Sequence, residues 1–106
     1  MKIFFDHCVD HRLRRLLIEH EIHTAYRMGW HEKKNGELLS LVEGAAFEVF
    51  LTVDQNIKHQ QSLSSRTLKF IVLIGSDNRY ETLAPLVPKV TDALTKISPG
   101  ELVEIS

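Results

Sequence analysis

Three things are scarce in this sequence, and each scarcity excludes a class of protein. The single cysteine, Cys8, cannot form an internal disulfide, so the chain is not a disulfide scaffold. Thirteen Lys and Arg against fourteen Asp and Glu leave a net charge of −1, so no overall positive field attracts nucleic acid. No apolar run approaches the ~18 residues of a membrane span, and the first residues lack a signal-peptide pattern. We therefore expect a cytoplasmic protein without membrane contact.

The overall composition is typical of one globular domain. The 106 residues are 43% hydrophobic and 25% charged, which are ordinary values for a folded domain. A chain of this length is close to the usual size of a single domain and buries roughly 60–70% of the surface that it exposes when unfolded. We expect residues 1–106 to form a single domain with its own core.

Short apolar runs alternate with stretches of helical spacing along the chain. The runs that suit buried strands span residues 2–5, 23–26, 49–53, 69–74 and 102–105. The helical stretches span residues 9–20, 35–46 and 80–97, and residues 54–65 predict a short helix and a loop. Because alternating strands and helices imply crossover connections, we expect an α/β fold. It would have three layers, α/β/α, around a mainly parallel sheet of about four or five strands.

Acidic residues follow the predicted strands at the point where each strand ends. Asp6 and Asp54 come directly after two of the strands, and Asp77 follows a third across a Gly-Ser turn. Glu37 lies in the first turn of the second predicted helix. Because the carboxyl ends of parallel strands share one edge of the sheet, where ligands bind, we expect these four carboxylates to converge.

Two interpretations of these acids are open. An aspartate between a strand and a helix is often an N-cap, and a glutamate in the first turn of a helix interacts favourably with the helix dipole. Several carboxylates at one edge, however, repel one another unless a cation lies between them. A hard divalent ion, Mg²⁺ or Mn²⁺, is the usual solution, and it would activate water for attack on a phosphate.

A receiver-like phosphoacceptor domain is one α/β design that places acids in this way, with Asp54 as the acceptor. That design also needs a second acid beside Asp6 and a lysine at the end of a late strand. Position 7 is His7, and no lysine follows the strand predicted over residues 69–74. The receiver interpretation is therefore not favoured.

Motifs spread over nearly the whole chain favour a second design. They are Asp6-His7-Cys8-Val9, Gly29-Trp30, Asn35-Gly36-Glu37-Leu38-Leu39, Phe50-Leu51-Thr52-Val53-Asp54-Gln55-Asn56, Gln60-Gln61, Asp77-Asn78-Arg79, the segment from Leu83 to Pro88, and Pro99-Gly100-Glu101. On these motifs the sequence resembles a PIN-like family of small bacterial proteins, part of the PIN-type ribonuclease superfamily. It departs from the family pattern at His7, where the family has a second acid, and at Ser62, where it has an asparagine.

The resemblance implies a divalent-metal-dependent endoribonuclease and suggests roles for particular residues. Asp6, Glu37 and Asp54 would be catalytic acids that bind Mg²⁺ or Mn²⁺, Asp77 would be an outer metal ligand, and Asn56 would position water. The substrate-binding candidates are Asn35, Gln60, Gln61, Lys34 and Arg79. The family also suggests RNA as the substrate, a toxin role with a small DNA-binding antitoxin as partner, and a homodimer as a candidate assembly.

The alternative is a binding module that holds nucleic acid or a protein partner without cleaving it. His7 in place of an acid and the lack of a basic surplus favour this alternative. Lys33, Lys34, Lys58 and Arg79 lie near predicted helix starts, where they could form a cationic rim for a phosphodiester or simply a charged surface.

Three further side-chain types have a functional and a structural interpretation. The spacing of His7 and His11 allows a zinc site, but surface histidines are favoured because no cysteine pair or HExxH glutamate accompanies them. Trp30 could stack on a nucleobase, although a lone loop tryptophan more often packs on the core. Cys8 stands at a predicted helix start, yet without a partner base it is interpreted as a small buried residue.

Overall fold

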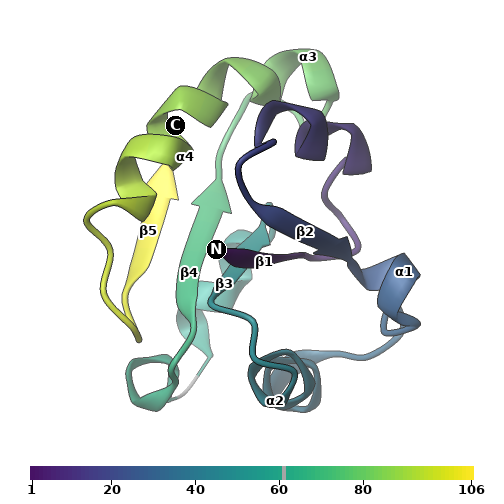
Figure 1. The fold of residues 1–106 in the computed structure, drawn as a ribbon, viewed down its shortest axis with the longest axis vertical. Coiled ribbons are helices and arrows are strands. Elements are labelled where there is room, and N and C mark those ends of the chain that lie inside the picture. The colour runs from purple at the N-terminus through teal and green to yellow at the C-terminus, as the bar shows by residue number, and fades with distance from the viewer. Residues whose placement is uncertain (61) are drawn as a thin grey trace.

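A parallel sheet of five strands forms the centre of the computed structural model, which describes residues 1–60 and 62–106, and residue 35 by its backbone alone (Figure 1). The strands are β1 (Lys2–Phe5), β2 (Glu21–Thr24), β3 (Val49–Thr52), β4 (Lys69–Leu73) and β5 (Leu102–Ile105). They lie in the order β2-β1-β3-β4-β5, and every neighbouring pair is parallel. The predicted α/β class and parallel sheet are confirmed.

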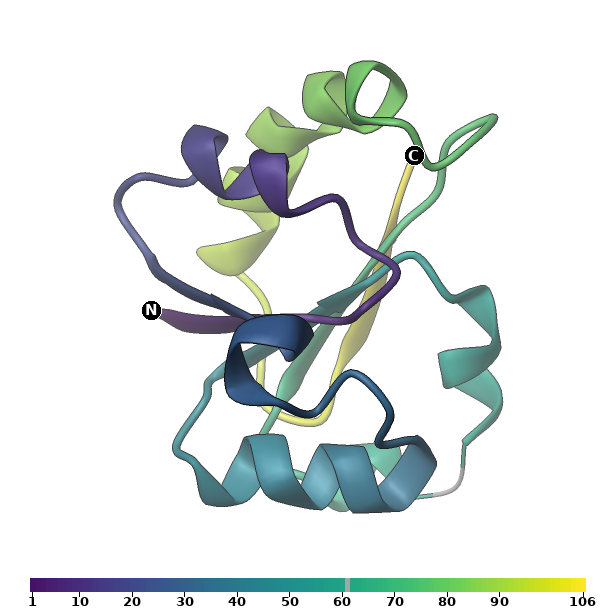
Figure 2. The same ribbon diagram turned by 90° about the vertical axis from the view of Figure 1, so that its right-hand side faces the viewer.

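Helical segments cover both faces of this sheet and give three layers (Figure 2). One face carries the 3₁₀ helices η1 (His11–Leu16) and η4 (Ala84–Leu86) and the α-helices α3 (Tyr80–Leu83) and α4 (Val87–Leu94). The other carries α1 (Ala25–Met28), α2 (Asn35–Gly44), η2 (Gln55–His59) and η3 (Leu63–Ser65). Among the described residues, no helix is both long and apolar enough to cross a membrane.

Alternation along β1 divides the core into two clusters. Successive strand residues point to opposite faces, so Ile3 and Phe5 pack under η1 and α4 while Phe4 packs under α2. Phe4 stacks on Phe50 with ring centroids 5.5 Å apart, and Trp30 lies against it at 6.0 Å. The packing interpretation of Trp30 is therefore confirmed, and this aromatic cluster anchors the segment that leads into α2.

The strand order reverses at β1, which lies between β2 and β3. The connection that leaves β1 turns to the face of η1, and the one that leaves β3 turns to the opposite face, where η2 lies. Such a reversal opens a crevice at the carboxyl ends of the two strands, the usual ligand site of a doubly wound sheet.

The helix predicted over residues 9–20 is wrong in length and type. Only His11–Leu16 is helical, as 3₁₀ turns, because the Asp10 side chain caps the backbone N–H of Arg12 and the chain must turn back before β2 begins at Glu21. The long helix predicted over residues 80–97 is also divided, into α3, η4 and α4, at the proline positions Pro85 and Pro88.

The strand predicted over residues 23–26 is displaced toward the N-terminus. β2 spans Glu21–Thr24, and Ala25–Met28 is the helix α1. The cause is local, because the Thr24 hydroxyl accepts a hydrogen bond from the backbone N–H of Arg27 and so caps a helix at this point. Tyr26 in this helical turn is exposed.

We expect the cap of η1 to be sensitive to acid. The Arg12 side-chain hydrogen bond lowers the pKa of Asp10 to about 2. A carboxyl group whose pKa falls on folding stabilises the native state above its ordinary pKa of ~3.9, and that contribution is lost as the pH falls through the lowered value. Asp10→Asn keeps a cap acceptor but lacks the charge, so it should be less stable than the parent at neutral pH.

The difference in unfolding free energy between parent and Asp10→Asn should shrink as the pH falls from ~4 toward about 2. Urea unfolding at a series of pH values measures it. A difference that stays constant over this range would show that the charge of Asp10 does not stabilise the fold.

Candidate functional site

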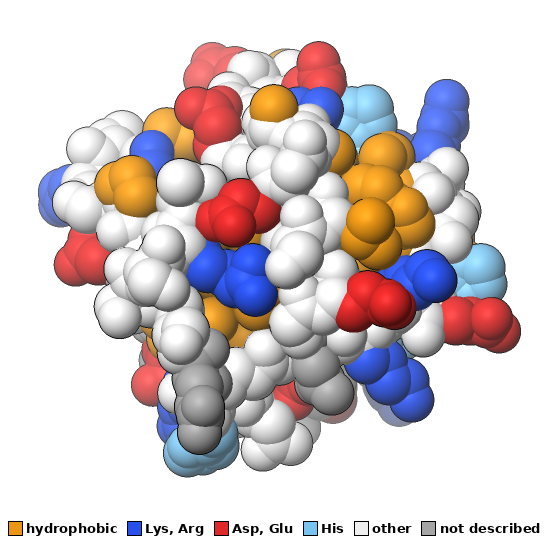
Figure 3. Space-filling view, turned by 90° about the horizontal axis from the view of Figure 1, so that it is seen from below, with side chains coloured by type: hydrophobic (Ala, Val, Ile, Leu, Met, Phe, Trp, Pro, Cys, Tyr) orange, Lys and Arg blue, Asp and Glu red, His pale blue; other side chains and the backbone are white. Residues whose placement is uncertain are grey.

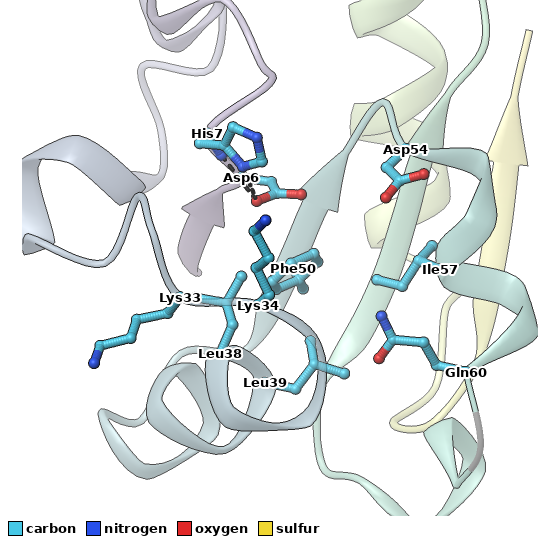
Figure 4. A pocket seen from close by; sticks show the side chains of 10 residues that line it. All are labelled: Asp6, His7, Lys33, Lys34, Leu38, Leu39, Phe50, Asp54, Ile57 and Gln60. Atoms are coloured by element: carbon cyan, nitrogen blue, oxygen red, sulfur yellow. Dashed lines mark hydrogen bonds and ion pairs between the residues drawn. The ribbon is translucent and has the colours of Figure 1, made fainter.

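A pocket of about 270 Å³ lies at the carboxyl ends of β1 and β3, where the strand order reverses (Figure 4). We call it the acidic pocket. It is lined by Asp6, His7, Lys33, Lys34, Leu38, Leu39, Phe50, Asp54, Ile57 and Gln60. Its volume is slightly below the usual range for small-molecule sites, and its lining is more polar than is typical of them, since among the described lining residues only Leu38, Leu39, Phe50 and Ile57 are apolar.

Asp6 is the most firmly positioned charged group of the acidic pocket. Its backbone N–H donates to the carbonyl of Leu51 on β3 at 3.0 Å, which continues the pairing of β1 with β3. Its side chain is only 10% exposed. One carboxylate oxygen, Oδ1, accepts the backbone N–H of His7 at 2.9 Å, and the other, Oδ2, accepts the hydroxyl of Thr52 at 2.8 Å. The carboxylate is therefore held by donors on two adjacent strand ends.

Thr52 links the two acids of the acidic pocket. Its hydroxyl is fully buried, and while it donates to Asp6 it accepts the backbone N–H of Asp54 at 3.0 Å. One buried hydroxyl thus sets the relative position of both chain segments. The sequence analysis missed this residue, although a lone polar side chain in the apolar run at residues 49–53 was the signal that could have found it.

Asp54 combines the two roles that the sequence left open. Its Oδ1 accepts the backbone N–H of Asn56 at 2.9 Å, which caps η2 and confirms the capping interpretation. The side chain also lines the acidic pocket and faces Asp6 across it (Figure 4). Its second oxygen accepts no hydrogen bond from the described residues, so that oxygen is free to contact a ligand.

The two lysines of the acidic pocket differ in direction. Lys34 points inward with its ammonium group toward Asp6, whereas Lys33 points away from the pocket (Figure 4). The Lys33 ammonium lies 3.8 Å from the carboxylate of Glu37, one helical turn further along the chain. Of the predicted cationic rim, only Lys33 and Lys34 are among the described residues that line the pocket. Lys58 instead forms an ion pair, with its Nζ 3.5 Å from Oε2 of Glu104.

Glu37 and Asp77 do not line the acidic pocket, so the predicted convergence of four carboxylates is met by two of them. The side chain of Glu37 is 65% exposed because α2 turns Leu38 and Leu39 toward the pocket instead. Asp77 follows β4, which β3 separates from β1. Hydrogen bonds from the side chain of Thr82 and then the backbone of Arg79 lower the pKa of Asp77, so this acid caps a turn.

Of the other residues predicted to act in the site, Gln60 lines the acidic pocket. Asn56 and Arg79 are exposed and lie outside its lining. Gln61 and the side chain of Asn35 lie outside the described residues.

The acidic pocket offers few ligands to a metal ion. In the described part of the chain, no three His, Cys, Asp or Glu side chains are grouped closely enough to share a metal. Two facing carboxylates remain, and Mg²⁺ is commonly bound by one or two carboxylates while it keeps several waters. Oδ1 of Asp6 accepts the backbone N–H of His7 and lies 3.2 Å from the His7 ring nitrogen Nδ1, while Oδ2 accepts the hydroxyl of Thr52 and lies 3.6 Å from the Cys8 sulfur. Asp6 and Asp54 are therefore the two carboxylates of the acidic pocket that could hold one Mg²⁺ or Mn²⁺ ion together with water.

Cys8 lies beside this centre but is poorly suited to be a nucleophile. Burial raises the pKa of the Cys8 thiol, and the charge of Asp6 raises it further, although a hydrogen bond with Thr52 acts in the opposite direction. The thiolate is the reactive form of cysteine. A thiol with a raised pKa stays protonated at neutral pH, which agrees with the structural interpretation of Cys8.

The chain matches no protein-family model, and comparisons with curated proteins and with solved structures gave no match either. Inferences about function therefore depend on the geometry of the acidic pocket and on the motifs in the sequence.

We expect Thr52→Val to lower the free energy of unfolding by about 1.5–3 kcal/mol, since it removes a hydrogen bond to a charged carboxylate and an acceptor for a buried N–H. Thr52→Ser keeps the hydroxyl and should lose only the burial of one methyl group, about 0.8 kcal/mol. Urea unfolding of both variants measures the difference. Equal losses in the two variants would contradict the bridging role of the hydroxyl.

Proposed function

We propose that this chain is a PIN-like, divalent-metal-dependent ribonuclease whose reaction centre is the acidic pocket. The observation that supports the proposal most is the pair of carboxylates, Asp6 and Asp54, that face each other at adjacent strand ends (Figure 4). The motif resemblance includes both acids and the apolar run before Asp54. The reaction class is hydrolysis, in which water adds to phosphorus and one P–O ester bond of RNA breaks.

Asp6 and Asp54 are the residues that would hold Mg²⁺ or Mn²⁺. When bound, such an ion supplies an activated water and stabilises the charge that develops on a phosphate under in-line attack. Asp6 is suited to this role because Thr52 and His7 prevent its carboxylate from reorienting. Asp54 is suited to it because its capping bond uses one oxygen and leaves the other for a ligand.

Lys34 and the apolar wall would act on the substrate. An ammonium group that points into the acidic pocket attracts a phosphate, and lysine binds phosphate as a point charge. Leu38, Phe50 and Ile57 line the same pocket, and an apolar wall lowers the local dielectric, so the charges act more strongly than in open water. The proposal therefore uses two acids and one lysine, and gives Glu37 and Asp77 no part in the reaction.

Binding without cleavage is the alternative function. Two specific observations favour it, namely the histidine at position 7 and the presence of two rather than three acids in the acidic pocket. In either case RNA is the proposed ligand. The toxin role and a small DNA-binding antitoxin partner follow from the resemblance alone and stay part of this proposal.

We expect the protein to cleave single-stranded RNA in Mg²⁺ or Mn²⁺, and EDTA to abolish the cleavage. Asp54→Asn should remove the activity without unfolding the protein, because asparagine is as good an N-cap as aspartate and only the charge is lost. Asp92→Asn is the matched control, since Asp92 is an exposed acid on α4 that pairs with Lys96 far from the acidic pocket. Gel analysis of a labelled RNA measures the cleavage.

Cleavage that survives EDTA, or that is equal in the parent and Asp54→Asn, would contradict the proposed reaction centre. Metal binding can be followed separately by thermal melts, because a ligand of the native state alone raises stability by about 2.7 kcal/mol at a hundredfold excess over Kd. Mg²⁺ should stabilise the parent more than Asp54→Asn. RNA binding without any cleavage by the parent would favour the binding-module alternative.

His7→Glu should lower the Mg²⁺ concentration required for half-maximal cleavage. The His7 ring lines the acidic pocket with Nδ1 3.2 Å from Oδ1 of Asp6. A carboxylate at this position supplies a hard oxygen ligand in place of an imidazole, which suits softer metals. Titration of the cleavage rate with Mg²⁺ measures the effect. A maximal rate more than about tenfold below the parent, about 1.4 kcal/mol in the barrier, would mean that the imidazole itself takes part.

A further inference from the structure

Two further hollows continue from the acidic pocket toward the outer edge of β2. The first shares Asp6 and His7 with the acidic pocket. The second shares His11, Thr24 and Tyr26 with the first and extends along β2, the last strand on that side of the sheet. We call these two hollows together the edge groove. It leads from the candidate reaction centre to the unpaired edge of the sheet.

The outer part of the edge groove is basic. Arg14 and Arg27 line it together with His11, and its lining includes no Asp or Glu among the described residues. Arg27 is exposed and makes no ion pair with the described residues, while the guanidinium of Arg14 contacts His11 rather than a carboxylate. These positive charges are therefore available to an external anion.

Asp6 and Asp10 line the inner hollow of the edge groove, and Glu21 lies beside the outer one. In the inner hollow, Asp10 binds Arg12 at 2.7 Å, and at the outer hollow His23 lies 2.8 Å from the carboxylate of Glu21. The face of the molecule around α2 differs, because basic and acidic side chains are interspersed there with apolar ones (Figure 3). The outer hollow of the edge groove thus presents two arginines and, among the described residues, no lining acid, although the whole chain has a net charge of −1.

An exposed aromatic platform lies in the edge groove. Tyr26 is 65% exposed and stacks on His31, with ring centroids 4.5 Å apart and planes inclined by 14°. Local backbone structure sets up the pair, since Gly29 ends α1 in the left-handed region at φ 75° and turns the chain back beneath Tyr26. A solvent-exposed aromatic surface of this kind is what unpaired nucleobases stack on.

We infer that the edge groove binds single-stranded RNA and directs it into the acidic pocket. A base stacks on Tyr26, and the backbone phosphates contact Arg14 and Arg27. Single-stranded RNA fits this surface because it offers exposed base faces together with a negative backbone, whereas the bases of a duplex are already stacked on one another. The delivery of the strand to a reaction centre rests on the proposed function, but the binding itself does not.

Binding of a fluorescently labelled oligouridylate, followed by anisotropy in EDTA so that no cleavage occurs, tests the edge groove. Tyr26→Ala should weaken binding about 5- to 150-fold, the range expected for loss of one base stack, while Tyr26→Phe retains it. Tyr26 and Arg27 are both exposed, so substitutions at these positions should keep the fold, and circular dichroism checks this. Arg27→Ala should lower the slope of log Kd against log salt by about 0.7.

Arg15→Ala is the matched control, because Arg15 is an exposed arginine of η1 outside the groove lining and should leave the slope unchanged. Unchanged binding in Tyr26→Ala and Arg27→Ala would overturn the edge groove, even if the parent cleaves RNA. If Tyr26→Ala and Arg27→Ala weaken binding while Arg15→Ala does not, the edge groove is supported, even if the parent cleaves nothing and the ribonuclease proposal fails.

Two other outcomes would also overturn it. One is a parent that binds no single-stranded RNA at all. The other is a dimer of the parent, detected by sedimentation, that Tyr26→Ala dissociates, because the surface would then be an interface between two copies of this chain.

Discussion

A single buried hydroxyl, that of Thr52, connects the two strand ends on which the candidate site depends. It donates to the carboxylate of Asp6 and accepts the backbone N–H of Asp54. A polar atom that is buried without partners costs free energy, so a hydroxyl at this position is retained only if both bonds form. The same two bonds keep the acids at a defined separation across the acidic pocket. Stability and the geometry of the candidate site therefore depend on the same interaction.

The order of the strands explains why these two acids meet and the others do not. β1 and β3 are neighbours, so residues that follow them share the crevice formed where their connections diverge to opposite faces. β4 lies one strand further away, and the turn after it uses Asp77 as a cap. Two acids near one point repel each other less than four would, which is consistent with a buried Asp6 held only by neutral donors and His7.

Acidic and basic side chains are mixed in the acidic pocket, whereas the lining of the outer hollow of the edge groove is basic among the described residues. The acidic pocket holds the facing carboxylates, and the edge groove beside it presents arginines next to the exposed Tyr26. The nearest acids make short-range contacts, since Asp10 forms an ion pair with Arg12 and Glu21 contacts the ring of His23. A chain with almost no net charge can thus offer a basic path to a polyanion, since fields at the surface are screened beyond ~8–10 Å.

The sequence by itself determined part of the secondary structure and its local capping. The apolar runs at Lys2–Phe5 and Leu102–Ile105 are strands with the predicted bounds, and Asp54 caps the helix that follows it, because periodicity and capping depend on neighbours in the chain. The tertiary structure alone decided that Asp6 meets Asp54, that Glu37 turns outward, and that Thr52 bridges two strands. Strand adjacency brings together residues more than forty positions apart, and local pattern contains no information about that pairing. The short η1 was likewise set by where the chain must turn back to reach β2.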